Sequence, residues 1–323
     1  MRGKKVLVSG GAGFIGSHLV KRLVGLGAEV SVILKYKSVI DNVRLSPVWE
    51  DVRRIEADLR NFDSLRQLRD EQYDVVFHLA AYNHVGDSFA HVNEALKSNL
   101  MGTANLLECG VEYGRFVYVS SSEVYGAQDV VPFREDMVPR PISPYAVGKY
   151  GGELYSRLTR MRSGRETVCV RPFNTFGPYQ SRRAVIPELI DKCLRGKVVE
   201  TTEGKQTREF NYVENQIDGL LAAAEVEPAF EEPVNLGSNR EIAICDLTRK
   251  IHALCGSRSE LRIGALPDRP TEIPRMRADY TRAKEVLGWE PKVSFEEGLE
   301  RTVAWYRQYL DVFCDPASAL NQL

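Results

Sequence analysis

The sequence predicts an α/β fold in which a doubly wound parallel sheet is followed by a smaller α/β lobe. Three observations support this prediction. Short apolar runs alternate with longer amphipathic runs through the first half, a glycine-rich turn follows the first apolar run, and beyond Pro172 short segments are broken by glycine and proline. Strands that alternate with helices pair in parallel, because each helix carries the chain back to the end where the previous strand began.

Six short apolar runs are predicted strands, and they are residues 5–8, 29–34, 52–56, 75–79, 116–120 and 167–171. Amphipathic helices separate them, and a charged amphipathic helix over residues 295–309 closes the chain. We expect residues 1–175 to form the first domain. Residues 176–323 should form mainly a ligand-binding lobe, with some segments returning to the sheet. Such a lobe would cover the carboxyl ends of the strands, where ligands bind in sheets of this kind.

The composition is that of an ordinary globular enzyme. Lysine plus arginine number 43 and aspartate plus glutamate number 44 among 323 residues, so no overall field favours nucleic acid or an anionic membrane. No stretch approaches the ~20 apolar residues of a membrane span, and no secretory signal opens the chain, so we expect a cytoplasmic protein. The six cysteines form no C-x-x-C pair, which predicts free thiols and no metal site.

A glycine-rich turn follows the first predicted strand and opens a helix. Gly10 permits a tight turn, Gly13 lets the backbone approach a pyrophosphate, and Gly16 allows close packing of the helix. The backbone N–H groups at the start of this helix, at Phe14 and Ile15, face the pyrophosphate. This turn therefore predicts a dinucleotide site on a Rossmann-type sheet.

The ends of the next two strands bear on the choice of dinucleotide. An acidic residue after the second strand would grip the ribose hydroxyls of NAD, but here Lys35, Lys37 and Ser38 follow it. Two lysines and a serine suit a 2′-phosphate, so the sequence favours NADP over NAD. Asp58 and Leu59, after the third strand, are placed to meet the adenine.

A serine-rich strand end and a Y-x-x-x-K pair indicate the reacting groups. Ser121, Ser122 and Glu123 follow the fifth strand, and Tyr145 and Lys149 are four residues apart, which places them on one face of a helix. An ammonium beside the phenol lowers a tyrosine pKa that starts near ~10, so that the phenol oxygen can act as a base.

The helix that carries this pair has its own signals. Ser143 and Pro144 predict its N-cap and first turn. Gly148, Gly151 and Gly152 are poor helix formers, and their presence predicts that a backbone or the cofactor approaches the helix closely.

In this order the motifs resemble the extended short-chain dehydrogenase/reductases that modify nucleotide sugars. The resemblance covers nearly the whole chain and includes these residues beyond those above: His78, Leu79, Ala80, Ala81, Asn99, Arg171 to Pro178, Arg208 to Phe210 and Leu287 to Pro291. It implies that Ser121 orients the sugar 4-hydroxyl, Tyr145 takes its proton and Lys149 holds the nicotinamide ribose. It also implies that Leu79, Ala80, Ala81 and Asn99 contact a tightly bound, recycled cofactor. Helices over residues 99–113 and 144–161 should pair with a second subunit in a four-helix bundle.

Glu123 decides which reaction we expect. Ser122 and Glu123 resemble the same positions of GDP-mannose 4,6-dehydratases, whereas simple 4-epimerases usually have small non-acidic residues there. A ketone at carbon 4 acidifies the proton on carbon 5, and a carboxylate can remove it while the 6-hydroxyl leaves as water. The hydride then returns to carbon 6. The sequence therefore predicts a nucleotide-sugar 4,6-dehydratase.

The resemblance also implies a set of substrate contacts. Asn174, Arg208 and Arg269 occupy positions like those that hold the diphosphate, and residues 182–187, with Arg183 and Val185, resemble the segment that lines the nucleotide. His84 matches a histidine near the sugar in glucose dehydratases, and Asn83 can bind a hydroxyl. The nucleotide base and the sugar are not fixed by these residues.

Three other functions remain open. A 4-epimerase needs no base at carbon 5, and a UDP-glucuronate decarboxylase needs a cation for its 6-carboxylate. A catalytically silent nucleotide-sugar sensor would not need the intact Ser121, Tyr145 and Lys149.

Overall fold

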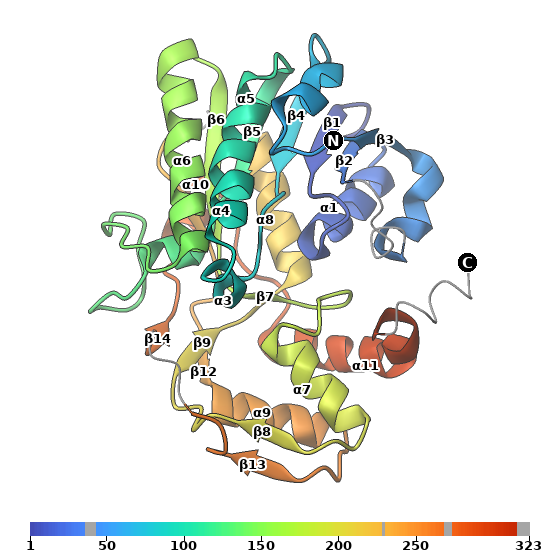
Figure 1. Ribbon diagram of the computed structural model, residues 1–323, viewed down its shortest axis with the longest axis vertical. Helices are drawn as coiled ribbons and strands as arrows, with labels where there is room; N and C mark the ends of the chain where they lie inside the picture. The colour runs from blue at the N-terminus through green and yellow to red at the C-terminus, as the bar shows by residue number, and fades with distance from the viewer. Residues whose placement is uncertain (36–42, 228–229, 268–272, 315–323) are drawn as a thin grey trace.

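The computed structural model of the chain describes residues 1–35, 43–227, 230–267 and 273–314, with side chains as far as residue 311. Its centre is one seven-stranded sheet in which every pair of neighbours is parallel. In spatial order the strands are β11 (Val234–Leu236), β6 (Glu166–Pro172), β5 (Glu112–Val119), β4 (Gln72–His78), β1 (Lys5–Ser9), β2 (Glu29–Leu34) and β3 (Val52–Glu56). The predicted doubly wound parallel sheet is confirmed (Figure 1).

Successive residues of the strands enter two different hydrophobic clusters. Val6 and Val8 of β1 pack in one cluster, while Leu7 between them packs in the other. This alternation follows from the pleat, which points neighbouring side chains to opposite faces. Both faces of β1 are therefore dry, as the unbroken apolar run predicts.

Helices cover both faces of the sheet. One face packs against α1 (Phe14–Gly25) and α8 (Val213–Glu225), whose apolar residues share the cluster of Val6. The other face packs against η2 (Phe62–Leu68), α5 (Gly102–Glu108) and α6 (Pro144–Ser163), whose apolar residues share the cluster of Leu7. Four further segments contact α6: α3 (Val85–Ser88), α4 (Val92–Leu96), η3 (Lys97–Met101) and η4 (Ser122–Tyr125). η1 (Ser46–Asp51) precedes β3 and packs near α1.

Several predicted boundaries differ from the structure, and the largest differences lie between β4 and β5. The predicted helix over residues 99–113 ends at Glu108, and Glu112 and Tyr113 already belong to β5. β5 begins four residues earlier than predicted, because Glu112 and Gly114 are exposed and give no apolar signal. A π-helical turn over Lys97–Met101, which the periodicity did not indicate, joins α4 to α5.

Helix α6 begins and ends as the sequence indicates. The Ser143 side chain accepts a hydrogen bond from the backbone N–H of Ala146 at 3.1 Å. The glycines predicted a close approach, and the structure shows what approaches. A Cβ on Gly148 would lie 2.9 Å from Cβ of Asn99, and one on Gly152 would overlap the Tyr118 hydroxyl. Glycine therefore lets α6 lie directly against η3 and β5.

The smaller lobe, which lies below the sheet in Figure 1, is built on short strands and helices. Two of its small sheets have two strands each: β7 (Thr175–Phe176) pairs with β10 (Asn211–Tyr212), and β8 (Val199–Thr201) pairs with β13 (Leu261–Ile263). In a third sheet β9 (Thr207–Glu209) lies between β12 (Glu241–Ala243) and β14 (Arg275–Met276). Its helices are α7 (Val185–Leu194), α9 (Ile244–Leu254) and α11 (Phe295–Cys314). The short helix α10 (Thr281–Leu287) lies near β11 and α8.

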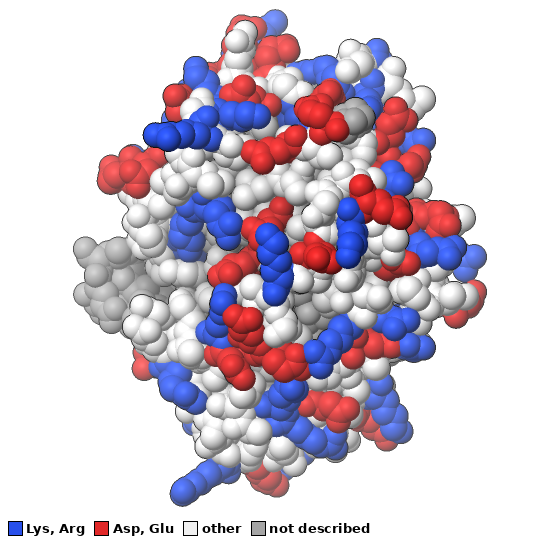
Figure 2. Space-filling model, turned by 180° about the vertical axis from the view of Figure 1, so that it is seen from behind, with Lys and Arg blue, Asp and Glu red and all other residues white. Residues whose placement is uncertain are grey.

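The surface agrees with the balanced composition. On the face seen in Figure 2, acidic and basic side chains are interspersed, and no area of that face carries one sign alone. None of the helices in the described ranges combines the length and the apolar character that a membrane crossing requires.

His78 at the end of β4 makes the stability of the folded chain depend on pH. Its Nδ1 lies 2.5 Å from the Ser9 hydroxyl and its Nε2 lies 2.9 Å from the Thr103 hydroxyl, and burial lowers the pKa of the ring to about 3. In the unfolded chain His78 binds a proton near pH 6.5, whereas in the folded chain it stays neutral until the pH is much lower. The stabilisation present above pH 6.5 is therefore lost as pH falls.

We expect the loss between pH 7 and pH 4 to reach roughly 3 kcal/mol from His78. Urea unfolding at several pH values measures it. His78→Gln should lower the stability at pH 7 and flatten the acid slope, whereas the same change at the exposed His91 should keep the wild-type slope. An unchanged slope in His78→Gln would contradict this assignment.

Candidate active site

A cavity of about 570 Å³ lies at the carboxyl ends of the strands, between the sheet and the smaller lobe. Its walls come from the turn after β1, the ends of β2 and β3, the loop after β4, the segment from the end of β5 into η4, the start of α6, and residues 172–175 with Gln180. The chain order of β1 and β4 makes their junction the point where the sheet winding reverses, which is where such sheets bind ligands.

The glycine-rich turn forms one wall and leaves no room for side chains. Gly10 has φ +72°, and a Cβ there would lie 2.6 Å from the backbone nitrogen of Ala80. The N–H of Gly13 donates to the carbonyl of Gly10 at 2.9 Å, and a Cβ on Gly16 would overlap that carbonyl. No side chain caps the start of α1 at Gly13, so its first N–H groups are open to an anion. This wall fits a pyrophosphate.

Charged side chains gather at the ends of β2 and β3. Lys35, Asp58, Arg60 and Glu94 all line the cavity. Arg60 Nε donates to Asp58 Oδ1 at 2.8 Å, and its guanidinium also pairs with Glu94. The hydrogen bonds from Arg60 lower the pKa of Asp58 to about 2. Arg60 and Glu94 were missed by the sequence analysis, and Lys37 and Ser38, predicted for this end, lie outside the described residues.

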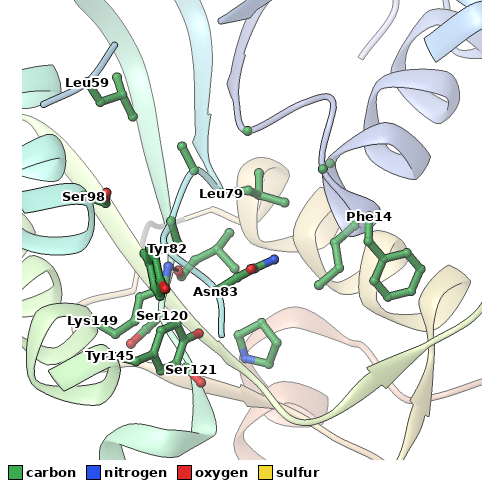
Figure 3. Close-up of a pocket in the computed structure, with 18 of the residues that line it drawn as sticks. Phe14, Leu59, Leu79, Tyr82, Asn83, Ser98, Ser120, Ser121, Tyr145 and Lys149 are labelled. Atoms are coloured by element: carbon green, nitrogen blue, oxygen red, sulfur yellow. Dashed lines mark hydrogen bonds between the residues drawn. The ribbon is translucent and has the colours of Figure 1, made fainter. Parts of the chain in front are cut away.

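The predicted reacting groups meet at the opposite end of the cavity. Figure 3 shows Tyr145, Lys149 and Ser121 close together, with Phe14 across the cavity from them. The Ser121 side chain caps η4 by accepting a hydrogen bond from the N–H of Glu123 at 3.2 Å. A hydrogen bond from the Ser121 hydroxyl also favours the ionised phenol of Tyr145. One serine thus orients both the strand end and the tyrosine.

The pKa of Tyr145 differs from the expectation. Burial raises it to about 12, the Ser121 hydrogen bond opposes this rise only in part, and the nearby charge of Glu123 raises it further. The sequence analysis expected the Lys149 ammonium to lower this pKa. In the structure Lys149 Nζ instead donates to the carbonyl of Val119 at 2.7 Å, and burial lowers the pKa of Lys149 to about 8. The expected lowering is not found, because burial is the largest influence on the pKa of Tyr145.

Glu123 and Ser122 occupy η4, which follows the end of β5. Both line the cavity, and the carboxylate of Glu123 lies close enough to Tyr145 to act on its titration. Ser122 is buried and its hydroxyl lies 3.5 Å from the sulfur of Met276 in the smaller lobe. A carboxylate and a phenol therefore share one end of the cavity.

Most of the other predicted cofactor residues line the cavity, but Asn99 supports the loop behind its wall. Phe14, Ile15, Leu59 and residues 79–81 line the cavity. Asn99 does not; it is buried, its side-chain oxygen accepts the N–H of Tyr82 at 2.7 Å, and its amide donates to the carbonyl of Tyr82. Asn99 holds the loop after β4 in place.

Two of the predicted substrate asparagines line the cavity. Asn83 follows β4, and Asn174 follows β6 and donates to the carbonyl of Glu209 at 3.1 Å. His84 does not line it, because its ring caps α3 by accepting the N–H of Asp87 at 3.1 Å. The predicted sugar contact of His84 is thus replaced by a structural one in this conformation.

Arg183 and Arg208, the predicted arginine contacts that the structure describes, lie outside the cavity wall. Arg183 pairs with Asp87, and Val185 begins α7. Arg208 donates to the carbonyl of Ile273 at 2.6 Å. Arg269 lies outside the described residues. The cations that line the cavity, within the described part of the chain, are Lys35, Arg60 and Lys149.

Comparison with known proteins follows this geometry. A family model described as GDP-mannose 4,6 dehydratase matches residues 7–302. The chain is 33% identical to UDP-glucuronic acid decarboxylase 1 of Danio rerio, over 95% of this chain and 74% of that protein.

Two solved structures that are similar to this chain belong to a dehydratase and an epimerase of nucleotide sugars. The dTDP-glucose 4,6-dehydratase DesIV of Streptomyces venezuelae, solved with NAD bound, is 33% identical with a TM-score of 0.85, covering 94% of this chain and 97% of that one. The UDP-glucose 4-epimerase of Thermotoga maritima, solved with UDP-glucose, is 32% identical with a TM-score of 0.86, covering 95% and 99%. Three reactions are therefore represented at similar identity.

Proposed function

The chain belongs to the extended short-chain dehydrogenase/reductase family of NAD-dependent nucleotide-sugar epimerases and dehydratases, and we propose that it is a nucleotide-sugar 4,6-dehydratase. One observation carries the proposal. Glu123 lines the same end of the cavity as Ser121 and Tyr145, and its charge acts on Tyr145. A 4-epimerase has no use for a carboxylate there, whereas loss of water needs a base for carbon 5.

Each residue then has a task. Ser121 holds the 4-hydroxyl of the hexose, and Tyr145 takes the hydroxyl proton as carbon 4 becomes a ketone. Bound nicotinamide supplies a hydride acceptor for carbon 4 and a hydride donor for carbon 6. Glu123 removes the proton from carbon 5 and returns it to the departing 6-hydroxyl, which leaves as water. The proton that Tyr145 took from the 4-hydroxyl then balances the reaction, because carbon 5 needs one proton when carbon 6 receives its hydride. Lys149 lines the same cavity and would hold the nicotinamide ribose when the cofactor is bound.

We propose NAD as the cofactor. The uncapped start of α1 and the glycines around it suit a pyrophosphate, and DesIV was solved with NAD. The sequence favoured NADP because of its basic segment after β2, but the solved relatives give that choice no support. Among the described residues at this end, Arg60 is already neutralised by Asp58 and Glu94, so it offers little attraction to a further phosphate.

A decarboxylase has less support in this cavity. Its substrate carries a 6-carboxylate that needs a cation near carbon 6. Of the cations that line the described cavity, Lys35 and Arg60 lie at the ends of β2 and β3, away from Tyr145, and Lys149 is bonded to the carbonyl of Val119.

Mass spectrometry of products tests the proposal. The purified protein is incubated without reductant with GDP-mannose, GDP- and UDP-N-acetylglucosamine, UDP-glucose, dTDP-glucose and UDP-glucuronate. Loss of one water from one substrate is the expected result. An unchanged mass with a new isomer would mean an epimerase, and loss of carbon dioxide from UDP-glucuronate would mean a decarboxylase.

We also propose a dimer through α6 and η3. Val147, Leu154, Leu158 and Met161 are all 46% or more exposed, and their spacing of seven, four and three residues puts them on one face of α6. Met101 on the adjacent η3 is 49% exposed and extends this apolar face. A face of this size on two packed helices is typical of an interface between two copies.

Leu158→Arg should convert the dimer to a monomer in light scattering during size-exclusion chromatography. A two-fold interface loses one Leu158 from each subunit. At roughly 2 kcal/mol per side chain, the dissociation constant of the dimer therefore rises about 1,000-fold. Leu26→Arg, at another exposed leucine beyond the end of α1, is the matched control and should leave the dimer intact. A wild-type monomer at micromolar concentration would rule the interface out.

A further inference from the structure

Glu153 of α6 and Arg171 of β6 form an ion pair in the interior of the protein. Arg171 Nε donates to Glu153 Oε2 at 3.1 Å, and Nη2 donates to Oε1. The two residues are only 8% and 3% exposed. The loss of hydration of two buried charges offsets most of their attraction, so such a pair adds little net stability. In addition, Arg171 Nη1 is buried and meets no hydrogen-bond acceptor within the described ranges. Stability alone therefore does not explain this pair.

Glu153 is bonded to the end of β5 that enters the cavity wall. The Ser120 hydroxyl donates to Glu153 Oε2 at 2.9 Å, and Ser120 lines the cavity. The carbonyl of the preceding residue, Val119, accepts the ammonium of Lys149 at 2.7 Å. The next residue is Ser121. The carboxylate of Glu153 therefore fixes the strand end from which these contacts of the site are made.

Arg171 contacts the other end of the same short segment. Its guanidinium carbon lies 4.8 Å from the centroid of the Tyr125 ring, a distance at which a cation is attracted to the face of an aromatic ring. Tyr125 is the last residue of η4 and is fully buried, and its hydroxyl donates to Asn235 Oδ1 at 2.7 Å. Residues 121–123 lie between the two contacts. One ion pair thus holds residues 120–125 at both ends.

We propose that Glu153 and Arg171 are positioning residues for the reaction. Their ion pair sets where residues 121–123 stand relative to Tyr145 and Lys149. Neither residue of the pair lines the cavity, so both act through the segment that they hold. The proposal rests on the proposed function only for its first step, the hydride transfer from carbon 4, which a dehydratase and an epimerase share.

Replacing the pair by two apolar residues tests the proposal. Glu153→Leu combined with Arg171→Met removes both charges together, so neither is left buried without a partner, and such exchanges often leave stability unchanged or higher. The NAD-loaded variant is mixed with each nucleotide sugar of the product assay in single-turnover experiments. The rate at which reduced nicotinamide appears should fall about 10²-fold, because a misplacement of about 1 Å costs that much.

Two further measurements separate positioning from a purely structural role. The Kd of the nucleotide sugar should stay within about threefold of wild type, because the lost contacts do not touch the ligand. A structural pair would lower the midpoint of urea unfolding and leave the rate of the folded variant unchanged. A rate of cofactor reduction within about threefold of wild type would overturn the proposal.

A double-mutant cycle shows whether the pair acts through Ser120. In the wild-type background, Ser120→Ala removes only the hydrogen bond to Glu153 and should slow cofactor reduction about tenfold. In the background of the pair variant it should have no further effect, because that bond is already absent. Equal effects in both backgrounds would contradict the link through Ser120. If the pair variant does not fold, Ser120→Ala alone is judged by the same threefold limit on the rate.

Glu166→Gln is the matched control on the same two strands. Arg115 of β5 pairs with Glu166 at the start of β6, at the end of the sheet opposite the cavity. Neither residue lines the cavity. This substitution also removes a carboxylate that bridges β5 and β6, and it should leave the rate of cofactor reduction at the wild-type value.

Amide hydrogen exchange tests the positioning without any substrate. Peptides that cover residues 119–126 should exchange faster in the pair variant than in the wild-type protein, while peptides from α1 keep their wild-type exchange. If the wild-type protein reduces its cofactor with none of the nucleotide sugars, the proposed function fails, and the exchange of residues 119–126 alone decides whether the pair holds this segment. Unchanged exchange there would overturn the proposal.

Discussion

Replacing Glu123 by glutamine is expected to abolish the loss of water while the first hydride transfer survives. Glutamine has nearly the same size and keeps the cap that Ser121 forms on the backbone N–H of residue 123. It cannot take the proton from carbon 5, and removal of a general base costs about 10²- to 10⁴-fold in rate. The phenol of Tyr145 and the ammonium of Lys149 remain, so oxidation at carbon 4 can still proceed.

The result is read from two signals in single-turnover experiments. The absorbance of reduced nicotinamide should rise and persist, because the hydride has no acceptor at carbon 6, and mass spectrometry should find no dehydrated product. Glu188→Gln on α7, where the carboxylate pairs with Lys192 at the surface, serves as the control. Wild-type product formation by Glu123→Gln would leave Glu123 a structural role and favour an epimerase.

Replacing Tyr145 by phenylalanine is expected to stop the reaction one step earlier. The ring still fills its buried place, but the oxygen that takes the 4-hydroxyl proton is gone. Both the rise in reduced nicotinamide and the product should fall by about 10³-fold or more, while the Kd for the nucleotide sugar stays close to wild type.

Tyr155→Phe provides a matched control on the same helix. Its hydroxyl donates to Glu108 at 3.0 Å, and Tyr155 is not among the residues that line the cavity. Its removal should change neither signal. A Tyr145→Phe variant that still reduces the bound cofactor at the wild-type rate would mean that another group takes the proton. The two substitutions together place each side chain before or after the ketone.

The parts of the site that the sequence predicted are those encoded in short stretches. Gly10, Gly13 and Gly16 lie within one turn, and Tyr145 and Lys149 lie within one helical turn, so local spacing is enough to place them. The strands were found because buried residues such as Val6 and Val8 form apolar runs. The polar first residues of β4 and β5 were missed for the same reason.

The parts that could not be predicted depend on contacts between distant segments. Arg60 meets Glu94 across 34 positions, and the backbone of Gln180 meets Tyr306 across 126. No motif records such a meeting. The same limit explains why the role of Arg183 was predicted differently, because the residues around Arg183 in the sequence do not reveal that Asp87 is its ion-pair partner. The pKa of Tyr145 also depends on its burial, which spacing does not give.

The strand β11 has a consequence for how the chain is made. This last strand of the sheet comes from Val234–Leu236, more than 60 positions after β6, beside which it pairs. Arg115 of β5 donates to the carbonyl of Val226 at the end of α8, which joins the same late segment to the centre of the sheet. A nascent chain emerging from the ribosome therefore displays an open β6 edge and a bare sheet face until residue 236 has left the exit tunnel. The dinucleotide half is completed only after much of the smaller lobe has been synthesised.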